Sequence, residues 1–327
     1  MRMDRRTRQG MALLTVLLLV AVMSVVAVAV LDDVRFSVRR TVNAETHAQA
    51  QWYADGAETL VRLRIAQLTV ANPDRTPLQP DWNGRAIELP IEGGQLRAIV
   101  RDGQACFNLN SVVTWTGDRF AARAAGETQL KRLGQVVGIE DGRMGTIVDS
   151  LVDWIDTDAV AKPQGAEDGA YAGLAEPYRT AGVPLAEVSE LRAIHGVDDD
   201  AYRRLRPHLC ALPTDRSPIN VNTLTEADAP LLVMLSAGDL GLPRARAALA
   251  ARPEAGWPDA AAFWRQPALA GFGPPPEGRE QVTVRTEYFT VRIDVDYGGT
   301  QAVRTALIEA QPGRPARTLI QRWTPED

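Results

Sequence analysis

The first part of the chain is dominated by one apolar run that continues into a long stretch without proline. Residues 11–31 include only two polar residues, Thr15 and Ser24. About 20 consecutive apolar residues span the hydrocarbon core of a bilayer, so this run is long enough to cross a membrane. The next proline is Pro73, and apolar residues before it recur every three or four positions, which is the period of an amphipathic helix. The sequence therefore predicts one helix from the membrane segment out to about Leu68.

The residues before the apolar run indicate how the chain is oriented and processed. Excess positive charge there places the N-terminus in the cytoplasm and everything after Leu31 outside it. A secretory signal peptide is cut after its apolar run, whereas here the plausible processing point, between Gly10 and Met11, precedes the run. A cut there would remove a leader, residues 1–10, and leave the anchor, residues 11–31, on the protein. The alternative is an uncleaved signal anchor. The excess positive charge before the apolar run comes from four arginines against one acid, Asp4: Arg2, Arg5, Arg6 and Arg8.

Composition limits the partners and the compartment of the remaining chain. The 327 residues suffice for one large domain or two smaller ones. A net charge of −5 gives no support for a nucleic-acid or anionic-membrane partner. In an oxidising compartment the two cysteines, Cys106 and Cys210, predict a disulfide. Such a bridge would contribute up to ~4.7 kcal/mol by the chain-entropy argument. The alternative is two buried thiols.

Strand patterns flank a helical middle segment. The segment around 86–100 predicts a hairpin that turns at Gly93 and Gly94. Beyond 281, apolar and polar residues alternate as in a half-buried strand, and a second glycine pair supplies the next turn. Residues after Pro312 are predicted to be irregular. The predicted fold is α+β: the rest of the long helix and the first strands over 32–115, an inserted all-α domain over 116–279, and C-terminal strands over 280–327. The alternating apolar residues are Phe289, Val291, Ile293 and Val295, and the turn is Gly298–Gly299.

These features resemble a known family. The Gly10–Met11 junction, the apolar helix and the small sheet resemble type IV pilin-like proteins, which prepilin peptidase cuts after such a glycine and methylates at the new N-terminus. More narrowly, the chain resembles minor pseudopilin K of the bacterial type II secretion system (the general secretion pathway protein K family). The segments that carry this likeness are "DWIDTDAVAKPQGAEDGAY", "PLAEVSELRAIHGVDDDAYRRLRPHLCALP" and "INVNTL".

The resemblance implies a type IV pilin-like fold, a long N-terminal helix on a small antiparallel sheet. It implies a single-pass inner-membrane protein with a periplasmic body, assembling with the minor pseudopilins I, J and H at the tip of the pseudopilus. The tip complex starts and caps the fibre that drives export of folded proteins across the outer membrane. Secreted cargo and the outer-membrane secretin are further candidate partners. The implied role is assembly and not catalysis.

One residue departs from the pattern of major pilins and pseudopilins. Thr15 stands at the fifth position after the cut, where those proteins carry a glutamate that is thought to pair with the N-terminal amine of a neighbouring subunit. A charge in hydrocarbon costs several kcal/mol unless it is paired, so such a pair helps draw subunits together. A subunit with threonine cannot make that contact, which fits a subunit at the end of a filament. The alternative is that threonine is simply tolerated in a membrane helix.

A cluster of acids predicts a cation site. Carboxylates one residue apart in a loop, with glycine nearby, can converge on a hard cation such as Ca²⁺. The spacing is not that of an EF-hand, and the residues alone leave a solvated acidic loop as the alternative. The resemblance implies calcium here, because the K pseudopilins bind calcium in this insertion. The candidate ligands are Asp156, Asp158, Glu167 and Asp168, with Asp153 on the preceding helix.

Two segments of the helical region are similar to the helix-hairpin-helix module of DNA-binding proteins. In that module, backbone N–H groups of a glycine hairpin contact phosphate. Residues 140–280 hold 22 acidic against 13 basic residues, a net charge of −9, and three aspartates follow the Gly196 hairpin directly. Because DNA binding needs a basic surface, we interpret these helices as a scaffold for protein contact. Asn220 and Asn222 are predicted to cap the helix that follows them.

Evidence for an enzyme is sparse. The three histidines, His47, His195 and His208, lack metal-ligand spacing, and no nucleophile elbow, phosphate-binding loop or zinc-protease motif occurs. Paired carboxylates could serve acid–base hydrolysis, as in glycosidases. A membrane-anchored periplasmic hydrolase and an anchored DNA-uptake protein are therefore the alternatives to a pseudopilin.

Overall fold

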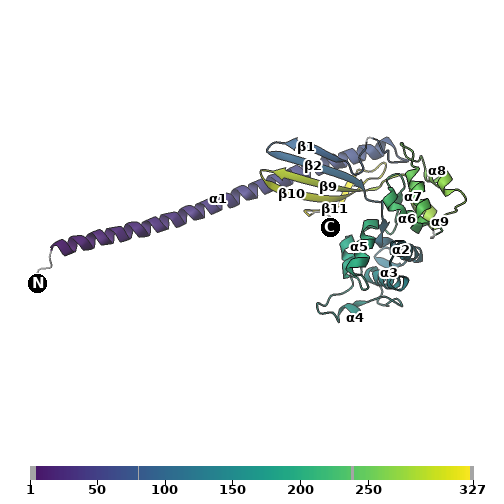
Figure 1. The fold of residues 1–327 in the computed structure, drawn as a ribbon, viewed down its shortest axis with the longest axis horizontal. Coiled ribbons are helices and arrows are strands. Elements are labelled where there is room, and N and C mark those ends of the chain that lie inside the picture. The colour runs from purple at the N-terminus through teal and green to yellow at the C-terminus, as the bar shows by residue number, and fades with distance from the viewer. Residues whose placement is uncertain (1–4, 80, 237–238, 325–327) are drawn as a thin grey trace.

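The computed structural model describes residues 5–79, 81–236 and 239–324. One long helix, α1 (Arg5–Ala71), runs without a break through the apolar run and into the folded body (Figure 1). Its first half projects away from the rest of the molecule. It ends two residues before Pro73, since the residue before a proline disfavours the helical conformation. The prediction of one helix continuing outward is confirmed.

The body contains a five-stranded antiparallel sheet in the order β1-β2-β9-β10-β11. Ile91 pairs with Gly94 across the first hairpin, and Gly93 has a φ of 79° in the turn. Gly94 admits no side chain, because a Cβ there would lie 1.8 Å from the carbonyl oxygen of Asp296. The predicted first hairpin is thus confirmed. The strands are β1 (Ala86–Ile91), β2 (Gly94–Asp102), β9 (Tyr288–Tyr297), β10 (Thr300–Glu309) and β11 (Arg317–Arg322).

The C-terminal half of this sheet confirms one prediction and overturns another. β9 and β10 form the predicted hairpin, with positive φ at Gly298 and Gly299. The expectation that residues after Pro312 are irregular was wrong, because β11 pairs with β10 as an edge strand. The register of the β10–β11 pairing shifts between Leu307 and Ile308, and such a bulge places an extra residue in one strand and interrupts its regular alternation.

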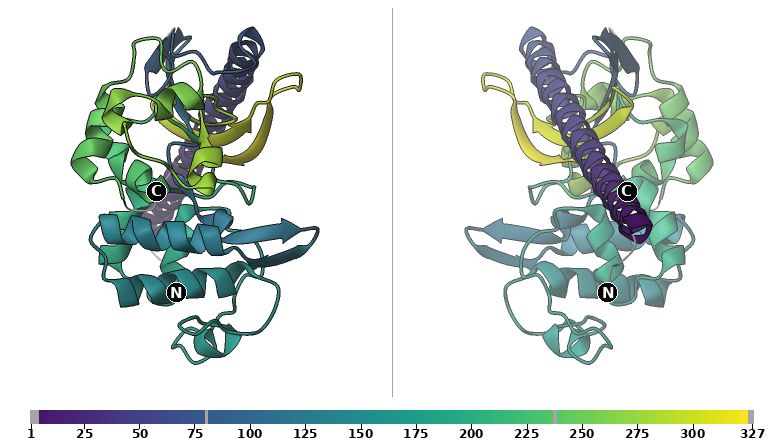
Figure 2. Two further views of the ribbon diagram at one scale, coloured as in Figure 1. Left: turned by 90° about the vertical axis from the view of Figure 1, so that its right-hand side faces the viewer. Right: turned by 90° about the vertical axis from the view of Figure 1, so that its left-hand side faces the viewer.

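α1 covers one face of the sheet through small residues. Ala50, Ala54 and Ala57 are buried against it, followed by Ile65 near the end of the helix. Alanines allow the helix axis to approach the strands closely, and the sheet contributes the alternating apolar residues that the sequence predicted. In Figure 2, α1 runs behind the strands in the left view and in front of them in the right view. The buried sheet residues on this face include Phe289, Val291, Ile293 and Val295.

The helical insertion lies between β2 and β9. The chain leaves the sheet at Asp102 and rejoins it at Tyr288. The insertion therefore begins before and ends after the predicted bounds, residues 116 and 279. The difference arises from short strand pairs, which a sequence pattern cannot distinguish from strands of the main sheet: β3 (Phe107–Asn108) with β6 (Leu209–Cys210), β4 (Val113–Thr116) with β5 (Arg119–Ala122), and β7 (Ile219–Asn220) with β8 (Val282–Thr283).

The insertion has an apolar core of its own, formed mainly by α2, α3 and α6. Phe107, Leu133, Ile147 and Leu232 are completely buried in it. In Figure 1, α7, α8 and α9 lie at the end of the body that is remote from the free end of α1, and α2 to α5 lie below the sheet. Its helices are α2 (Ala124–Val136), α3 (Asp141–Ile155), α4 (Asp168–Tyr171), α5 (Asp199–Leu205), α6 (Ala229–Leu235), α7 (Leu242–Ala250), α8 (Ala260–Trp264) and α9 (Pro276–Gln281).

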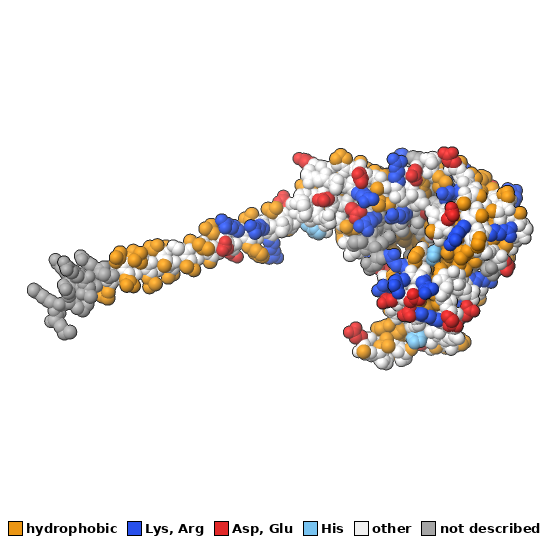
Figure 3. Space-filling model, in the orientation of Figure 1, with side chains coloured by type: hydrophobic (Ala, Val, Ile, Leu, Met, Phe, Trp, Pro, Cys, Tyr) orange, Lys and Arg blue, Asp and Glu red, His pale blue; other side chains and the backbone are white. Residues whose placement is uncertain are grey.

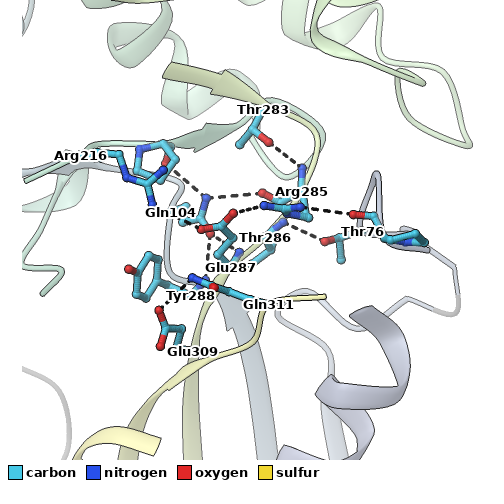
Figure 4. Close-up of polar contacts among 12 residues, drawn as sticks. Thr76, Gln104, Arg216, Thr283, Arg285, Thr286, Glu287, Tyr288, Glu309 and Gln311 are labelled. Atoms are coloured by element: carbon cyan, nitrogen blue, oxygen red, sulfur yellow. Dashed lines mark hydrogen bonds and ion pairs between the residues drawn. The ribbon is translucent and has the colours of Figure 1, made fainter. Parts of the chain in front are cut away.

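A buried polar junction fixes the two chain crossings between sheet and insertion (Figure 4). The side-chain oxygen of Gln104 accepts hydrogen bonds from the backbone N–H groups of Glu287 and Tyr288, the latter at 2.9 Å. The hydroxyl of Thr76, in the loop after α1, accepts from the N–H of Thr286 at 2.8 Å. Buried polar groups with full sets of partners specify one arrangement. The junction therefore holds helix, sheet and insertion in a defined relation.

Candidate functional site

The projecting part of α1 is the first functional element. Within the described residues, the helix from Leu13 to Ala71 is long and apolar enough to cross a membrane, and its most apolar window is fully exposed. Large hydrophobic side chains are exposed at nearly every turn position from Leu13 to Leu31, and Figure 3 shows those on the visible face of the helix. A helix that is apolar on every side is stable in lipid and not in water. This segment can therefore anchor the protein in a membrane.

Residues predicted to govern processing and assembly lie on this same helix. Gly10 and Met11 are both within α1, and Thr15 is exposed one turn further on. Residues 1–4 of the predicted leader are outside the described residues. Cleavage at the Gly10–Met11 bond remains a prediction.

The acidic loop brings together three of the five predicted ligands. Carboxylate oxygens of Asp156, Asp158 and Glu167 lie within 4.8 Å of one another. Asp156 follows α3 directly, and Glu167 precedes α4, so the loop between these two helices folds back on itself. The two remaining residues of the predicted set, Asp153 and Asp168, are not part of this cluster of three.

Asp153 and Asp168 hold the loop in place from either side. Asp153 is buried in the last turn of α3 and accepts the backbone N–H of Lys162 with both oxygens at 3.1 Å. Gly165 passes so close that a Cβ there would lie 1.9 Å from an Asp153 oxygen. Asp168 accepts the N–H and the hydroxyl of Thr180, both at 2.9 Å. These two carboxylates shape the loop through hydrogen bonds within the protein.

Electrostatics at the three converging carboxylates favour a cation. Burial raises the pKa of Asp156 to about 7, and the neighbouring charges of Asp158, Asp153 and Glu167 act in the same direction. Burial also raises the pKa of Glu167. One oxygen of Asp156 and one of Glu167 are buried without a hydrogen-bond partner. Buried acceptors without donors are costly, and oxygen-only donors are the set that Ca²⁺ prefers, so the residues fit this ion.

The disulfide prediction is confirmed. Cys106 and Cys210 are bridged, with their Cα atoms 5.7 Å apart and a sequence separation of 104. The bridge lies beside the paired strands β3 and β6, where the insertion begins and where it turns back toward the sheet. It therefore ties the two ends of the first part of the insertion together.

A buried ion pair that the sequence did not predict joins α1 to the sheet. The Nε of Arg304 on β10 lies 2.5 Å from Glu58 of α1, and both side chains are at least 93% buried. Arg304 also contacts Asp55 at 2.9 Å, and the hydroxyl of Thr318 donates to Glu58 at 2.6 Å. The available signal was a charge on the buried face of each element: Arg304 stands between Ala302 and Ala306 on the apolar face of its strand.

The hairpin at Gly196 does not offer a phosphate site. Gly196 has a φ of 86°, but the carboxylate of Asp198 accepts the N–H groups of Asp200 and Ala201. The amides that a phosphate would need are thus occupied, and the occupying group is negative. This geometry gives no support to the DNA-uptake alternative.

The predicted capping role of Asn220 and Asn222 was wrong. Both are buried; Asn220 donates to Thr286 at 2.8 Å, and Asn222 exchanges hydrogen bonds with the backbone of Trp257. The following helical turn is capped by Thr225 instead. These asparagines fasten loops inside the insertion, a role that short-range spacing cannot reveal.

A membrane-length helix that continues onto a small antiparallel sheet is the architecture of the type IV pilin-like class. Two family models match the insertion of this chain, both described as type II secretion system (T2SS), protein K, over residues 105–214 and 219–285. The chain belongs to the type II secretion system protein K family.

Relatives of the whole chain carry the same name. The chain is 35% identical to "Type II secretion system protein K" of Pectobacterium carotovorum subsp. carotovorum, over 93% of each sequence. It is also 35% identical to the Klebsiella pneumoniae protein over 98% of each, and 36% identical to that of Aeromonas hydrophila over 91% of each.

A solved structure has the same fold. It is titled "The Crystal Structure of the GspK-GspI-GspJ complex from enterotoxigenic Escherichia coli Type 2 Secretion System". The superposition has a TM-score of 0.76 at 31% identity and covers 88% of this chain and 99% of the solved chain. The pilin-like fold with a helical insertion, predicted from the sequence, is confirmed.

Proposed function

We propose that this chain is the minor pseudopilin that joins the minor pseudopilins I and J in the tip complex, which starts the pseudopilus and caps it. The observation that carries the proposal is that part of the insertion, α7 to α9, covers the end of the body remote from the membrane helix (Figure 1). A further pseudopilin stacked beyond that end would meet the insertion. Thr15, in place of the glutamate expected in a repeating subunit, supports the same end position.

Immunogold labelling of overproduced pseudopili tests this proposal. The tip position predicts label at one end of a filament, and label spaced along the shaft would overturn it. A secretion assay in a host lacking the gene gives the functional readout, since loss of the protein should leave cargo in the periplasm.

We propose further that prepilin peptidase cuts between Gly10 and Met11, leaving an inner-membrane anchor with the N-terminus in the cytoplasm and the body in the periplasm. The disulfide between Cys106 and Cys210 supports this compartment, because such bridges persist outside the cytoplasm. Assembly contacts with the minor pseudopilin H, the secretin and secreted cargo belong to the same proposal.

The acidic loop is proposed to hold Ca²⁺ through Asp156, Asp158 and Glu167. The two buried oxygens without partners support this assignment. When bound, the ion would neutralise three converging carboxylates and stiffen the loop between α3 and α4. Asp153 and Asp168 would position the loop through their own hydrogen bonds.

The hydrolase alternative is less well supported, and we propose that the protein is not an enzyme. A hydrolase needs a substrate cleft over its carboxylates. A cleft of about 710 Å³ lies elsewhere, between the sheet and the insertion, and none of its lining residues comes from the acidic loop.

A further inference from the structure

A cleft of about 710 Å³ separates the outer face of the sheet from the insertion. Strands β2, β9, β10 and β11 form one wall, and the segments around Glu187 and Leu209 form the other. The opposite face of the sheet is buried against α1 through residues such as Val100 and Val291. A volume of this size is typical of a ligand site, and contacts made by α1 leave it open.

One row of side chains crosses the sheet wall of the cleft from β2 to β11. Arg101 lies opposite Thr290 in the pairing of β2 with β9. Leu307 of β10 lies opposite Thr290 on one side and Ile320 of β11 on the other. Directly paired residues share a face of a sheet, and all four line the cleft. Three strand spacings of ~4.8 Å make the row about 14 Å long, which is the length of about four residues of an extended chain.

The two ends of this row differ in chemistry. Leu307 is 9% exposed and packs with Leu212 and Tyr288 in a small apolar cluster, against which Ile320 also packs. This is the apolar end of the row, on β10 and β11. The end on β2 is Arg101, which is exposed. A ligand lying along the row would therefore meet apolar surface at one end and a cation at the other.

Three of the five charged residues that line the cleft already have partners within the chain. The Nε of Arg322 lies 2.6 Å from a carboxylate oxygen of Glu187, which joins the sheet wall to the insertion wall. Asp102 accepts the N–H of Gln104 at 2.8 Å and the hydroxyl of Thr223. These charges are balanced or satisfied without a ligand.

The other two charged residues are cations, one on each wall: Arg101 on the sheet and Arg206 on the insertion. Both are exposed. Among the residues that the structure describes, neither guanidinium has a hydrogen-bond or ion-pair partner. Two such cations in one cleft attract anions, and a guanidinium matches a carboxylate group through two parallel hydrogen bonds.

We propose that this cleft binds an extended acidic segment of a secreted protein, with carboxylates on Arg101 and Arg206 and an apolar side chain on the apolar end of the row. The inference rests on the proposed function, because a protein awaiting export would meet this chain at the tip of the pseudopilus. Subunits anchored in the same membrane approach alongside α1, whereas a protein free in the periplasm can reach the opposite face of the sheet.

Peptide binding to the purified full chain in detergent tests the chemistry of the cleft. The probe is a fluorescein-labelled peptide of about six residues in which glutamate and leucine alternate, because an extended chain directs successive side chains to opposite sides. The reference peptide carries lysine in place of glutamate. Fluorescence anisotropy should show the acidic peptide binding at least about tenfold more tightly. Equal binding of the two peptides, or binding of neither, would overturn the proposal.

Three variants locate the binding. Arg101→Gln and Arg206→Gln should each weaken binding of the acidic peptide about tenfold, since each removes one charge-assisted pair. Arg97→Gln is the matched control, because Arg97 is exposed on the same strand and face as Arg101 but does not line the cleft. It should bind the peptide as the wild type does. Melting temperatures should stay unchanged in all three, because these are surface substitutions.

Two results with these variants would contradict the cleft. The first is full affinity in the double variant Arg101→Gln/Arg206→Gln, and the second is an equal loss in Arg97→Gln. Thr324 lines the cleft, and two acids follow it, Glu326 and Asp327. Peptide binding that appears only after deletion of residues 325–327 would therefore show that the chain's own acidic segment fills the cleft, and would overturn the proposed occupant.

A secretion assay in a host that lacks the gene separates the cleft from the proposed function. Failure of the wild-type chain to restore export would overturn the proposed function and the inference with it. The double variant Arg101→Gln/Arg206→Gln should still capture the minor pseudopilins I and J but leave cargo in the periplasm. Normal export by this variant would overturn the cleft alone. Loss of capture would show an assembly surface and overturn the proposed occupant.

A photoreactive benzoylphenylalanine in place of Thr290, within the row, identifies the occupant in the same host. The proposal predicts adducts with a secreted protein from position 290 and none from position 97. Adducts with another pseudopilin or with a second copy of this chain would overturn the proposed occupant.

Discussion

The ion pair between Arg304 and Glu58 links α1 to the sheet within the buried interface between them. Besides its contacts with α1, the guanidinium donates to Gln321 at 2.6 Å and lies 4.5 Å from the ring centre of Trp323. Replacing Arg304 by methionine preserves much of the aliphatic volume and removes the charge and all of these donors. The Glu58 carboxylate would then remain buried with only the Thr318 hydroxyl as donor.

The expected loss follows from this uncompensated charge. Breaking a buried ion pair by removing one partner costs about 3–5 kcal/mol, whereas replacing both partners by apolar residues of similar size is often neutral or stabilising. Arg304→Met should therefore lower the free energy of unfolding by about 3–5 kcal/mol. The double variant Glu58→Met/Arg304→Met should recover most of that loss.

Urea unfolding of the purified full chain in detergent, followed by tryptophan fluorescence, measures these free energies. A loss of under about 1 kcal/mol in Arg304→Met would refute the reasoning, since it would show that the pair behaves as a solvated surface bridge. A double variant no more stable than the single variant would refute it as well, because the loss would then come from packing and not from a stranded charge.

Three further predictions concern the insertion and its attachment. Calcium at about 100 times its dissociation constant should stabilise the wild type by about 2.7 kcal/mol relative to the protein in chelator, and should therefore raise its melting temperature. Asp156→Asn should abolish this rise in melting temperature. Burial raises the pKa of Asp102 to about 6 from 3.8, so its contribution to stability is present below pH 4 and lost as the pH rises to 6. Asp102→Asn should remove this pH dependence of the free energy of unfolding, and above pH 6 the variant should be more stable than the wild type by about 2–3 kcal/mol. A variant whose free energy of unfolding changes with pH in parallel with that of the wild type would contradict this prediction. Replacing Cys106 and Cys210 by alanine should lower the free energy of unfolding by about 2–5 kcal/mol. An unchanged urea midpoint would show that the disulfide does not stabilise the fold.

Long periodic elements were predictable from the sequence. The helix through residues 11–68 and the hairpins around Gly93 and Gly298 are encoded by local patterns, namely apolar spacing and glycine turns. β11 was not predictable in this way, because it is stabilised by pairing with β10 and its flanks are rich in proline and glycine. The start of the insertion was missed because short strand pairs such as β3–β6 depend on contacts across about 100 residues.

The acidic loop illustrates the same limit at a site. Spacing alone identified the segment that carries the converging acids, and three of them do converge. It could not assign Asp153 and Asp168 to backbone and threonine donors, because those partners depend on how the loop folds. Arg304 and Glu58 are 246 residues apart. The sequence shows each of them only as a single charged residue on an apolar face, so it could not predict that they pair.

Native mass spectrometry of the complex, purified from membranes of the original host, would show both the processing of this chain and its copy number. We predict one copy of this chain, beginning at Met11 with an added methyl group, together with the minor pseudopilins I and J. A chain that begins at Met1, or several copies of it in one assembly, would contradict a processed protein that occupies the pseudopilus tip.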